Sequence, residues 1–241
     1  MRYSKYFKSE QKIFLRSLTP DASSGRLDAL TAYFQEEGDD HFDLLLPYQA
    51  SEEENFPFYP DMPFEILSDA MGLGVRLTGN FVEQRRPDLI RLRVNNDLQI
   101  FQRRFASRLD VSIGLRYTKG QGTLRSFREQ WEKNVRILQN TKDLSKLPSF
   151  PRTRVNLSNG GIRFQIKSPV QVADLCLLLL KLDENGAPIC ALAEVVWLDE
   201  NEAQGRRCAG LQFLSILEAD QKRIVDFIKK EAPSSAEKTG G

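Results

Sequence analysis

Short apolar runs that alternate with polar residues dominate this chain, and a period of two residues predicts β-strands. The clearest case is Leu89–Val94, where apolar and basic residues alternate as in a strand with one face in water. Two apolar runs, Leu30–Phe34 and Phe42–Leu46, flank a polar turn and predict a hairpin. Further strands are predicted at Phe64–Leu67 and Gly74–Phe81. The first half therefore indicates a small antiparallel barrel.

The second half alternates in the same way, but one helical stretch interrupts it. Apolar residues from Leu124 to Leu138 recur at helical spacing, and Ser126 with Glu129 matches a capping box, so a helix is predicted at Ser126–Asn140. We interpret its apolar stripe as covering the core or a partner subunit. A closing helix is predicted at Glu218–Lys230. The predicted strands are Leu109–Tyr117, Arg152–Leu157, Gly161–Ile166, Val172–Leu182, Ile189–Leu198 and Arg206–Phe213, with a hairpin turn at Asp183–Gly186.

Composition and charge narrow the class of protein. The 241 residues suit one large β domain or two small ones, and 41% of them are hydrophobic, enough for a real core. The net charge of +1 excludes the general basic field of a non-specific nucleic-acid binder, so any anion site is local. The polar N-terminus lacks the apolar core of a signal peptide, and the apolar run Leu175–Leu180 is too short to span a bilayer. We expect a cytoplasmic protein.

The cysteines and the single histidine argue against zinc hydrolysis and against a histidine-based catalytic triad. Cys176, Cys190 and Cys208 lie in apolar strand-like contexts and are interpreted as reduced, buried small hydrophobes. The single histidine, His41, stands among aspartates in a turn-like segment and is interpreted as a solvated loop residue. A metal site needs several suitably spaced nitrogen or sulfur ligands, so none is predicted.

The first candidate for binding chemistry is the run Arg103-Arg104-Phe105-Ala106-Ser107-Arg108. A guanidinium is permanently charged, binds phosphate with two parallel hydrogen bonds and stacks on flat rings. It also matches the O6 and N7 acceptors of guanine. Arg104 and Arg108 are thus suited to clamp a base and a phosphate, although such a run by itself is as typical of a solvated basic face.

The second candidate is Asn156-Leu157-Ser158-Asn159-Gly160-Gly161. Asn156 supplies both donors and an acceptor, and Ser158 supplies a hydroxyl. Gly160 and Gly161 permit positive φ and a close backbone approach. Taken alone, this segment also fits an ordinary hairpin turn.

Together, the two segments resemble the PilZ family of cyclic di-GMP receptors, whose motifs are R-x-x-x-R and [D/N]-x-S-x-x-G. Arg104 and Arg108 match the first motif; Asn156, Ser158 and Gly161 match the second. Ala193–Trp197 and Ala209–Phe213 also resemble later strands of that family, so the resemblance covers roughly residues 102–230. More loosely, the residues before Leu98 are similar to the barrel that precedes PilZ in flagellar-brake-type proteins.

The resemblance implies a mainly β fold with two antiparallel β-barrel domains, an inserted helix and a C-terminal helix. We expect an N-terminal split barrel at residues 1–98, a PilZ barrel at 99–231 with a helical insertion near 120–150, and a disordered tail at 232–241. The insertion is longer than is usual in the family, and it is a candidate surface for a homo-oligomer or a protein partner. Arg103 adds a cation directly before the first motif. In this respect the chain resembles members of the family that bind a stacked pair of cyclic di-GMP molecules.

The function implied is that of a non-catalytic cyclic di-GMP receptor without a metal. Arg104 and Arg108 are expected to hold guanine and phosphate, with Arg103 as an auxiliary stacker, while Asn156, Ser158, Gly160 and Gly161 form the barrel side of the site. Binding is expected to order the segment from Asn96 to Arg108, fix the two barrels relative to one another, and so regulate motility through a flagellar protein or another effector.

Three alternatives stay open at this point. One is a degenerate PilZ module that binds proteins and no nucleotide. Another is a single-stranded nucleic-acid-binding barrel protein that stacks bases on Arg103, Arg104 and Phe105. An enzyme is the least favoured, because no cluster of acid, base and nucleophile is evident.

Overall fold

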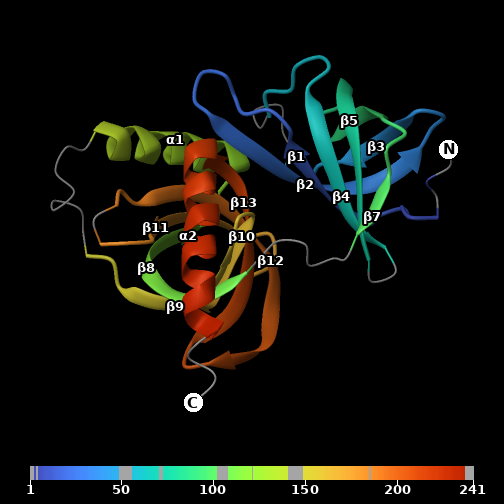
Figure 1. Cartoon of the computed structure of the whole chain (residues 1–241). Coiled ribbons are helices and arrows are strands. Elements are labelled where there is room, and N and C mark those ends of the chain that lie inside the picture. The colour runs from blue at the N-terminus through green and yellow to red at the C-terminus, as the bar shows by residue number, and fades with distance from the viewer. Residues whose placement is uncertain are drawn as a thin grey trace. The chain divides into compact units, whose positions relative to one another are not determined.

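The computed structural model describes residues 3, 5–48, 56–70, 73–101, 108–120, 122–140, 149–184 and 186–236 (Figure 1). The chain divides into two compact units, Met1–Phe105 and Ala106–Gly241. Antiparallel strands are the main secondary structure of each unit. The predicted fold class, mainly β with an inserted and a closing helix, is confirmed.

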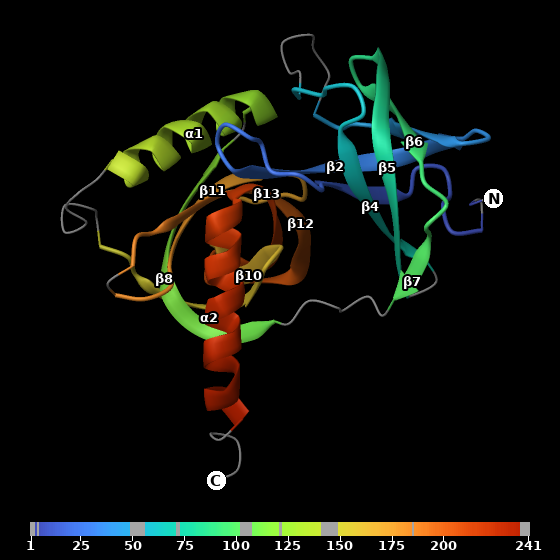
Figure 2. The same cartoon turned by 45° about the horizontal axis from the view of Figure 1, so that its top comes forward.

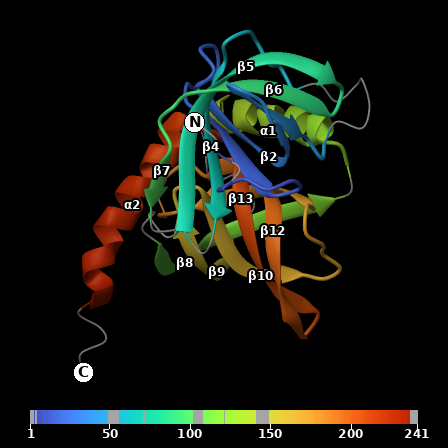
Figure 3. The same ribbon diagram turned by 90° about the vertical axis from the view of Figure 1, so that its right-hand side faces the viewer.

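The first unit is a closed ring of six antiparallel strands. Its spatial order is β1-β4-β5-β6-β3-β2, and the pairing of β1 with β2 closes the ring. β7 pairs with β5 outside the ring. The strands are β1 (Lys12–Ser17), β2 (Arg26–Glu37), β3 (His41–Leu45), β4 (Pro63–Ala70), β5 (Leu73–Arg86), β6 (Leu89–Val94) and β7 (Gln99–Phe101). Figure 3 shows these strands from another side.

Alternation of buried and exposed residues builds this barrel, because successive side chains of a strand point to opposite faces. In β1, Ile13 and Leu15 are fully buried. Aromatic rings fill much of the interior; those of Phe34 and Phe42 meet edge to face with centroids 5.1 Å apart. The predicted hairpin of β2 and β3 is confirmed. The sequence analysis missed β1 and the three-residue β7.

The second unit is also a closed ring of six antiparallel strands. Its order is β13-β10-β9-β8-β11-β12, and β12 pairs with β13 to close it. The apolar strand β11 is buried along nearly its whole length. The predicted hairpin of β11 and β12 is confirmed. The strands are β8 (Leu109–Gly120), β9 (Arg152–Ser158), β10 (Gly161–Lys167), β11 (Leu175–Lys181), β12 (Ile189–Ala203) and β13 (Arg206–Leu217).

Two helices pack on different strands of this second barrel (Figure 2). Helix α1 (Leu124–Asn140) lies in sequence between β8 and β9 and packs against β11 and β12. Helix α2 (Glu218–Ala236) packs against β8, β9 and β13, with Ile224 and Ile228 buried. Neither described helix combines the length and apolarity that a membrane-spanning helix requires.

Several local predictions were wrong. The amide of Ser126 bonds the hydroxyl of Thr123 at 3.2 Å, so Thr123 caps α1 and Ser126 lies inside the helix. His41 is the first residue of β3, half-buried with its ring over Gly38, rather than a loop residue. Cys176 and Cys190 are buried, but Cys208 is only half-buried. Helix α2 continues to Ala236, past the predicted end at residue 230.

Candidate functional site

The predicted arginine motif is only partly within the described residues. Arg103 and Arg104 lie outside them, as does Phe105. Arg108 is described, is exposed to solvent and immediately precedes β8. Its position can therefore be related to the second motif through the strand register.

The pairing of β8 with β9 brings Arg108 and the second motif to one end of the barrel wall. Leu109 pairs with Leu157 in this antiparallel register. Arg108 directly precedes Leu109 and Ser158 directly follows Leu157, so both stand at the same end of this strand pair. Residues separated by 50 positions thus lie at the same end of one strand pair, as a shared binding site requires.

Asn156 lies at the centre of a polar row on the outward face of the second barrel. It pairs with Asp110 of β8 on one side and with Arg163 of β10 on the other. Its Nδ2 donates a hydrogen bond to Asp110 Oδ1 at 3.1 Å, and Arg163 Nη2 lies 3.5 Å from the same carboxylate oxygen. Its neighbours in β9, Val155 and Leu157, are buried and point the opposite way.

The turn that carries Ser158 is held from three sides. Ser158 Oγ donates to the carbonyl oxygen of Gly161 at 3.1 Å. The Phe213 amide of β13 donates to Gly160 O at 3.0 Å. Gln221 Nε2 of α2 donates to Asn159 O at 3.1 Å. These bonds fix the backbone beside the hydroxyl of Ser158.

Of the two reasons predicted for glycine at position 161, only the close backbone approach is confirmed. Its φ does not lie in the left-handed region, so positive φ does not explain the glycine. Instead, a Cβ at this position would lie 2.3 Å from the carbonyl oxygen of Leu211 in β13. Close packing of β10 on β13 therefore excludes any side chain here.

The polar row continues to an exposed aromatic ring. In the strand register Arg163 pairs with Gly210 of β13, and Gly210 pairs with Trp197 of β12. The Trp197 residue is 42% exposed. Its indole occupies the space over Gly210, where a Cβ would lie only 2.1 Å from Nε1. The outward face thus ends in a flat apolar surface of the kind on which a nucleobase stacks.

The combined groups on this face are suited to an anionic ligand that has flat rings. We call the face the outer row and define it by Asp110, Asn156, Arg163, Gly210 and Trp197. It offers a guanidinium, an amide and an aromatic surface, and Arg108 with Ser158 lies at the adjoining end of β8 and β9. The carboxylate of Asp110 is the one acidic group in this set.

Sequence reasoning missed four members of the outer row: Asp110, Arg163, Gly210 and Trp197. Asp110 and Arg163 stand at exposed positions of alternating strands, whereas β12 is buried continuously from Ile189 to Val195 before it reaches Trp197. Alternation therefore indicated the face of Asp110 and Arg163 but not that of Trp197. The register between neighbouring strands, which brings Asp110 and Arg163 next to Asn156 and places Trp197 beside Gly210, is not readable from these segments.

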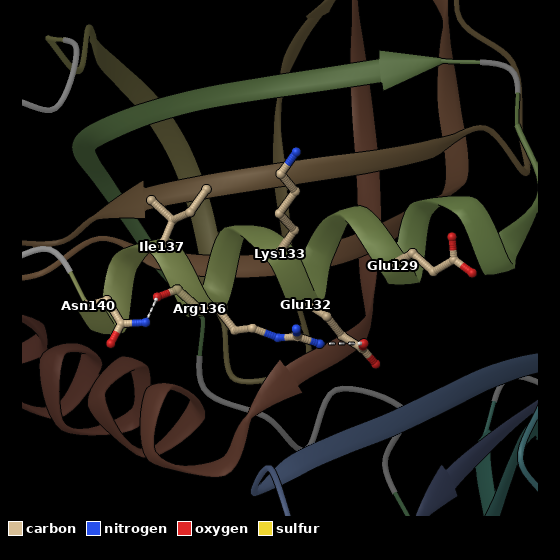
Figure 4. Close-up of a pocket in the computed structure, with 6 residues that line it drawn as sticks. All are labelled: Glu129, Glu132, Lys133, Arg136, Ile137 and Asn140. Atoms are coloured by element: carbon tan, nitrogen blue, oxygen red, sulfur yellow. Dashed lines mark hydrogen bonds and ion pairs between the residues drawn. The ribbon is translucent and has the colours of Figure 1, made fainter.

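A separate hollow lies on the outside of α1 and contains none of the predicted site residues (Figure 4). Its volume is about 510 Å³. Its lining includes an ion pair between Glu132 and Arg136 at 3.6 Å, one turn apart. The lining residues, all from α1, are Glu129, Glu132, Lys133, Arg136, Ile137 and Asn140. This is the pattern of a charged surface helix rather than of an enclosed ligand site.

Within the described part of the chain, no three histidine, cysteine or acidic side chains are grouped closely enough to hold a metal ion. Burial raises the pKa of the Cys176 and Cys190 thiols to about 12, which makes them poor metal ligands and poor nucleophiles.

Comparison with known proteins gives a family match over the second unit. The family model described as "PilZ domain" matches residues 102–230. A search of the curated proteins gives no match.

Matches to solved structures span most of the chain. The inhibitor of motility MotI/DgrA from Bacillus subtilis is 14% identical, with a TM-score of 0.38, over 95% of this chain and 99% of that one. YcgR from Escherichia coli, in complex with c-di-GMP, is 15% identical, with a TM-score of 0.35, over 95% and 88%. The K. pneumonia MrkH–c-di-GMP complex is 12% identical, with a TM-score of 0.33, over 95% and 90%. These likenesses are too distant to assign a function.

Proposed function

Since the chain belongs to the PilZ domain family, we propose that it is a non-catalytic receptor for cyclic di-GMP. The observation that supports this proposal is the pairing of Leu109 with Leu157, because Arg108 and Ser158 are the next residues at that end of β8 and β9. Two motifs far apart in sequence then contribute to one surface.

Each group has a complementary feature on the ligand. Arg104 and Arg108 would bind phosphate oxygens and the O6 and N7 acceptors of guanine, with Arg103 as an auxiliary stacking group. Asn156 and Ser158 would bind the edge of a base from the barrel side, and Gly160 with Gly161 would form the turn beneath it. Arg163 and Trp197 add a cation and a stacking surface, which favours a charged, flat ligand.

The proposed mechanism follows from the place of the arginines in the chain. Arg103 and Arg104 fall at the junction of the two compact units, Met1–Phe105 and Ala106–Gly241. A ligand bound by these arginines and by Asn156 would tie this junction to the second barrel. It would thereby favour one arrangement of the two units, provided that its affinity differs between arrangements. We propose that this change is read by a flagellar or other effector in the cytoplasm.

The test is titration calorimetry of the full chain with cyclic di-GMP. Loss of a buried, charged hydrogen-bonding partner costs about 2–5 kcal/mol, or roughly 30-fold to several thousand-fold in affinity. Arg104→Ala and Arg108→Ala should fall in this range, and Ser158→Ala should lose less, because a neutral hydrogen bond contributes about 1 kcal/mol. The same titration reports whether one or two ligands bind.

Arg125→Ala is the matched control. Arg125 lies on α1 and is 58% exposed, where it pairs with Glu129 within one helix. Its removal should leave the affinity unchanged. Wild-type affinity in both motif variants would refute the clamp. Binding of single-stranded oligonucleotides with steep salt dependence, together with indifference to cyclic di-GMP, would instead favour the nucleic-acid alternative.

A further inference from the structure

Asp110 is an acidic residue in a surface that is otherwise suited to bind an anion. Its side chain is 60% exposed, so it is not held there by burial. A carboxylate repels phosphate groups, and on charge alone it weakens the binding of a doubly negative ligand. Its presence beside Asn156 therefore calls for a compensating role.

The contact between Asp110 and Asn156 decides which end of the amide is free. An ionised carboxylate only accepts hydrogen bonds, whereas an asparagine amide has one donating and one accepting end. Asn156 Nδ2 faces Asp110 Oδ1 at 3.1 Å, and the reversed amide would place two acceptors against each other. The carboxylate thus commits the donating end of Asn156 and leaves Oδ1 as the group that can meet a ligand.

We propose that Asp110 is a positioning residue that makes Asn156 present its carbonyl oxygen to the N1–H and 2-amino donors of guanine. This inference rests on the proposed function. Guanine presents two adjacent donors on this edge, while adenine presents a ring-nitrogen acceptor beside its amino group. A fixed acceptor at Asn156 therefore favours guanine, and it complements arginine groups that bind the O6 and N7 acceptors of the same base.

Substitution of Asp110 by asparagine changes the affinity for cyclic di-GMP in opposite directions through charge and through positioning. Asp110→Asn removes a negative charge and also loosens Arg163, which lies 3.5 Å from the carboxylate. Both effects would raise the affinity for an anion. The new amide, however, can either accept from or donate to Asn156, so the preferred orientation is lost. If positioning dominates, the affinity for cyclic di-GMP falls despite the gain in positive charge.

The experiment is calorimetric titration of the full chain with cyclic di-GMP. We expect Asp110→Asn to bind about tenfold more weakly than wild type, since one well-placed hydrogen bond to the base is lost. The double variant Asp110→Asn with Asn156→Asp should recover most of the wild-type affinity, because a carboxylate at position 156 accepts in either orientation. It also restores the net charge of the surface.

Two controls separate positioning from charge and from damage to the fold. Glu184→Gln neutralises a carboxylate that is 91% exposed and 4.0 Å from Arg152, in the turn after β11, and should leave the affinity unchanged. Thermal unfolding checks the fold of each variant. Should Asp110→Asn unfold, Asp110→Ala takes its place, with the same expected loss and the same rescue by Asn156→Asp.

The outcomes distinguish this inference from the proposed function. No binding of cyclic di-GMP by the wild-type chain overturns both. Binding by wild type with equal or tighter binding by Asp110→Asn overturns the role of Asp110 alone. Weaker binding that Asn156→Asp does not rescue also overturns it, because the defect would then not act through the amide.

Discussion

The indole Nε1 of Trp131 donates a hydrogen bond to the carbonyl oxygen of Cys190 at 3.0 Å. Trp131 is 1% exposed, and this bond joins α1 to β12 of the second barrel. Trp131 thus holds the inserted helix on the barrel in two ways: its apolar ring is buried, and its indole N–H has a hydrogen-bond acceptor.

We expect substitutions at Trp131 to separate these two contributions. Trp131→Phe removes the hydrogen bond and part of the buried ring, and should lower the free energy of unfolding by about 1–2 kcal/mol. Trp131→Ala also removes the buried ring and should cost about 3–5 kcal/mol. Chemical denaturation measures both. Lys133→Ala, on the exposed face of α1, is the control, and equal stability of Trp131→Phe and wild type would show that the bond contributes nothing.

A methyl group at Gly161 should destabilise the second barrel. Its Cβ would lie 2.3 Å from a backbone oxygen of β13, so the strands must separate at the turn that bears Ser158. We expect Gly161→Ala to cost about 1–3 kcal/mol, as overpacking does. Gly120→Ala is the matched control, because its Cβ would meet Phe127 at an ordinary 3.5 Å. Equal melting temperatures of the two variants would contradict this account.

Asp43 should make the first barrel sensitive to acid. Arg91 holds this buried carboxylate with two bonds of 2.8 Å, and Arg85 adds a third of 3.1 Å. Hydrogen bonds from Arg91 lower the pKa of Asp43. Because the folded pKa lies below the unfolded one, the stabilisation is complete above pH ~4 and is lost as pH falls through the folded pKa.

Asp43→Asn should therefore cost about 3 kcal/mol of unfolding free energy at pH 7, since it leaves two arginines without their buried partner. The difference between variant and wild type should shrink as the pH falls below the unfolded pKa. Urea denaturation at several pH values, followed by circular dichroism, gives both numbers. Asp40→Asn, at a side chain 72% exposed, should behave as wild type at every pH. A difference for Asp43→Asn that does not vary with pH would refute the linkage.

The three thiols should react at different rates. Burial raises the pKa of Cys176 and Cys190 to about 12, so their thiolate fraction at pH 8 is on the order of 10⁻⁴. Cys208 is only half-buried and should react first with a disulfide reagent. Cys208→Ser should abolish the fast phase, while all three cysteines react in guanidinium. A fast phase that survives in Cys208→Ser would place the exposed thiol elsewhere.

Trp197 should report ligand binding directly. Its exposed indole stands at the end of the outer row, whereas the side chain of Trp131 is buried between α1 and β12. If the proposed receptor function holds, cyclic di-GMP should change the tryptophan emission, because a guanine ring quenches or shields the exposed indole. Trp197→Phe should lose this change. Persistence of the full change in that variant would assign the signal to Trp131 and remove Trp197 from the site.

Much of the fold was predictable because alternation along a strand depends on local burial alone. This held for β6, β9 and β10, whose alternation was read correctly. The pattern failed in β1, where the half-buried Phe14 stands between the buried Ile13 and Leu15 and hides the alternation. It also failed where strands continue beyond the core: the last five residues of β5 are all exposed, so polar residues there carry no alternation. The capping pair Ser126 and Glu129 misled because Thr123, three residues earlier, already caps the helix.

Some residues of the candidate site could be grouped from the sequence, and others could be grouped only from the fold. Asn156, Ser158 and Gly161 form a contiguous motif, so their proximity follows from the chain itself. The pairing of Asp110 with Asn156 depends on which strands are neighbours and in which register, and only the folded barrel gives this information.

Ring closure also limits how this protein recognises anything. Every strand of either ring has a neighbour on both sides, through the β1–β2 pairing in the first and the β12–β13 pairing in the second. Their main-chain amides and carbonyls are thus already hydrogen-bonded to neighbouring strands. A peptide therefore finds no open strand edge in the rings on which to add a further strand. Selectivity on the outer surface of either barrel therefore depends on side chains. Exchanging a few outward residues can change the preferred ligand without disturbing the strands beneath them.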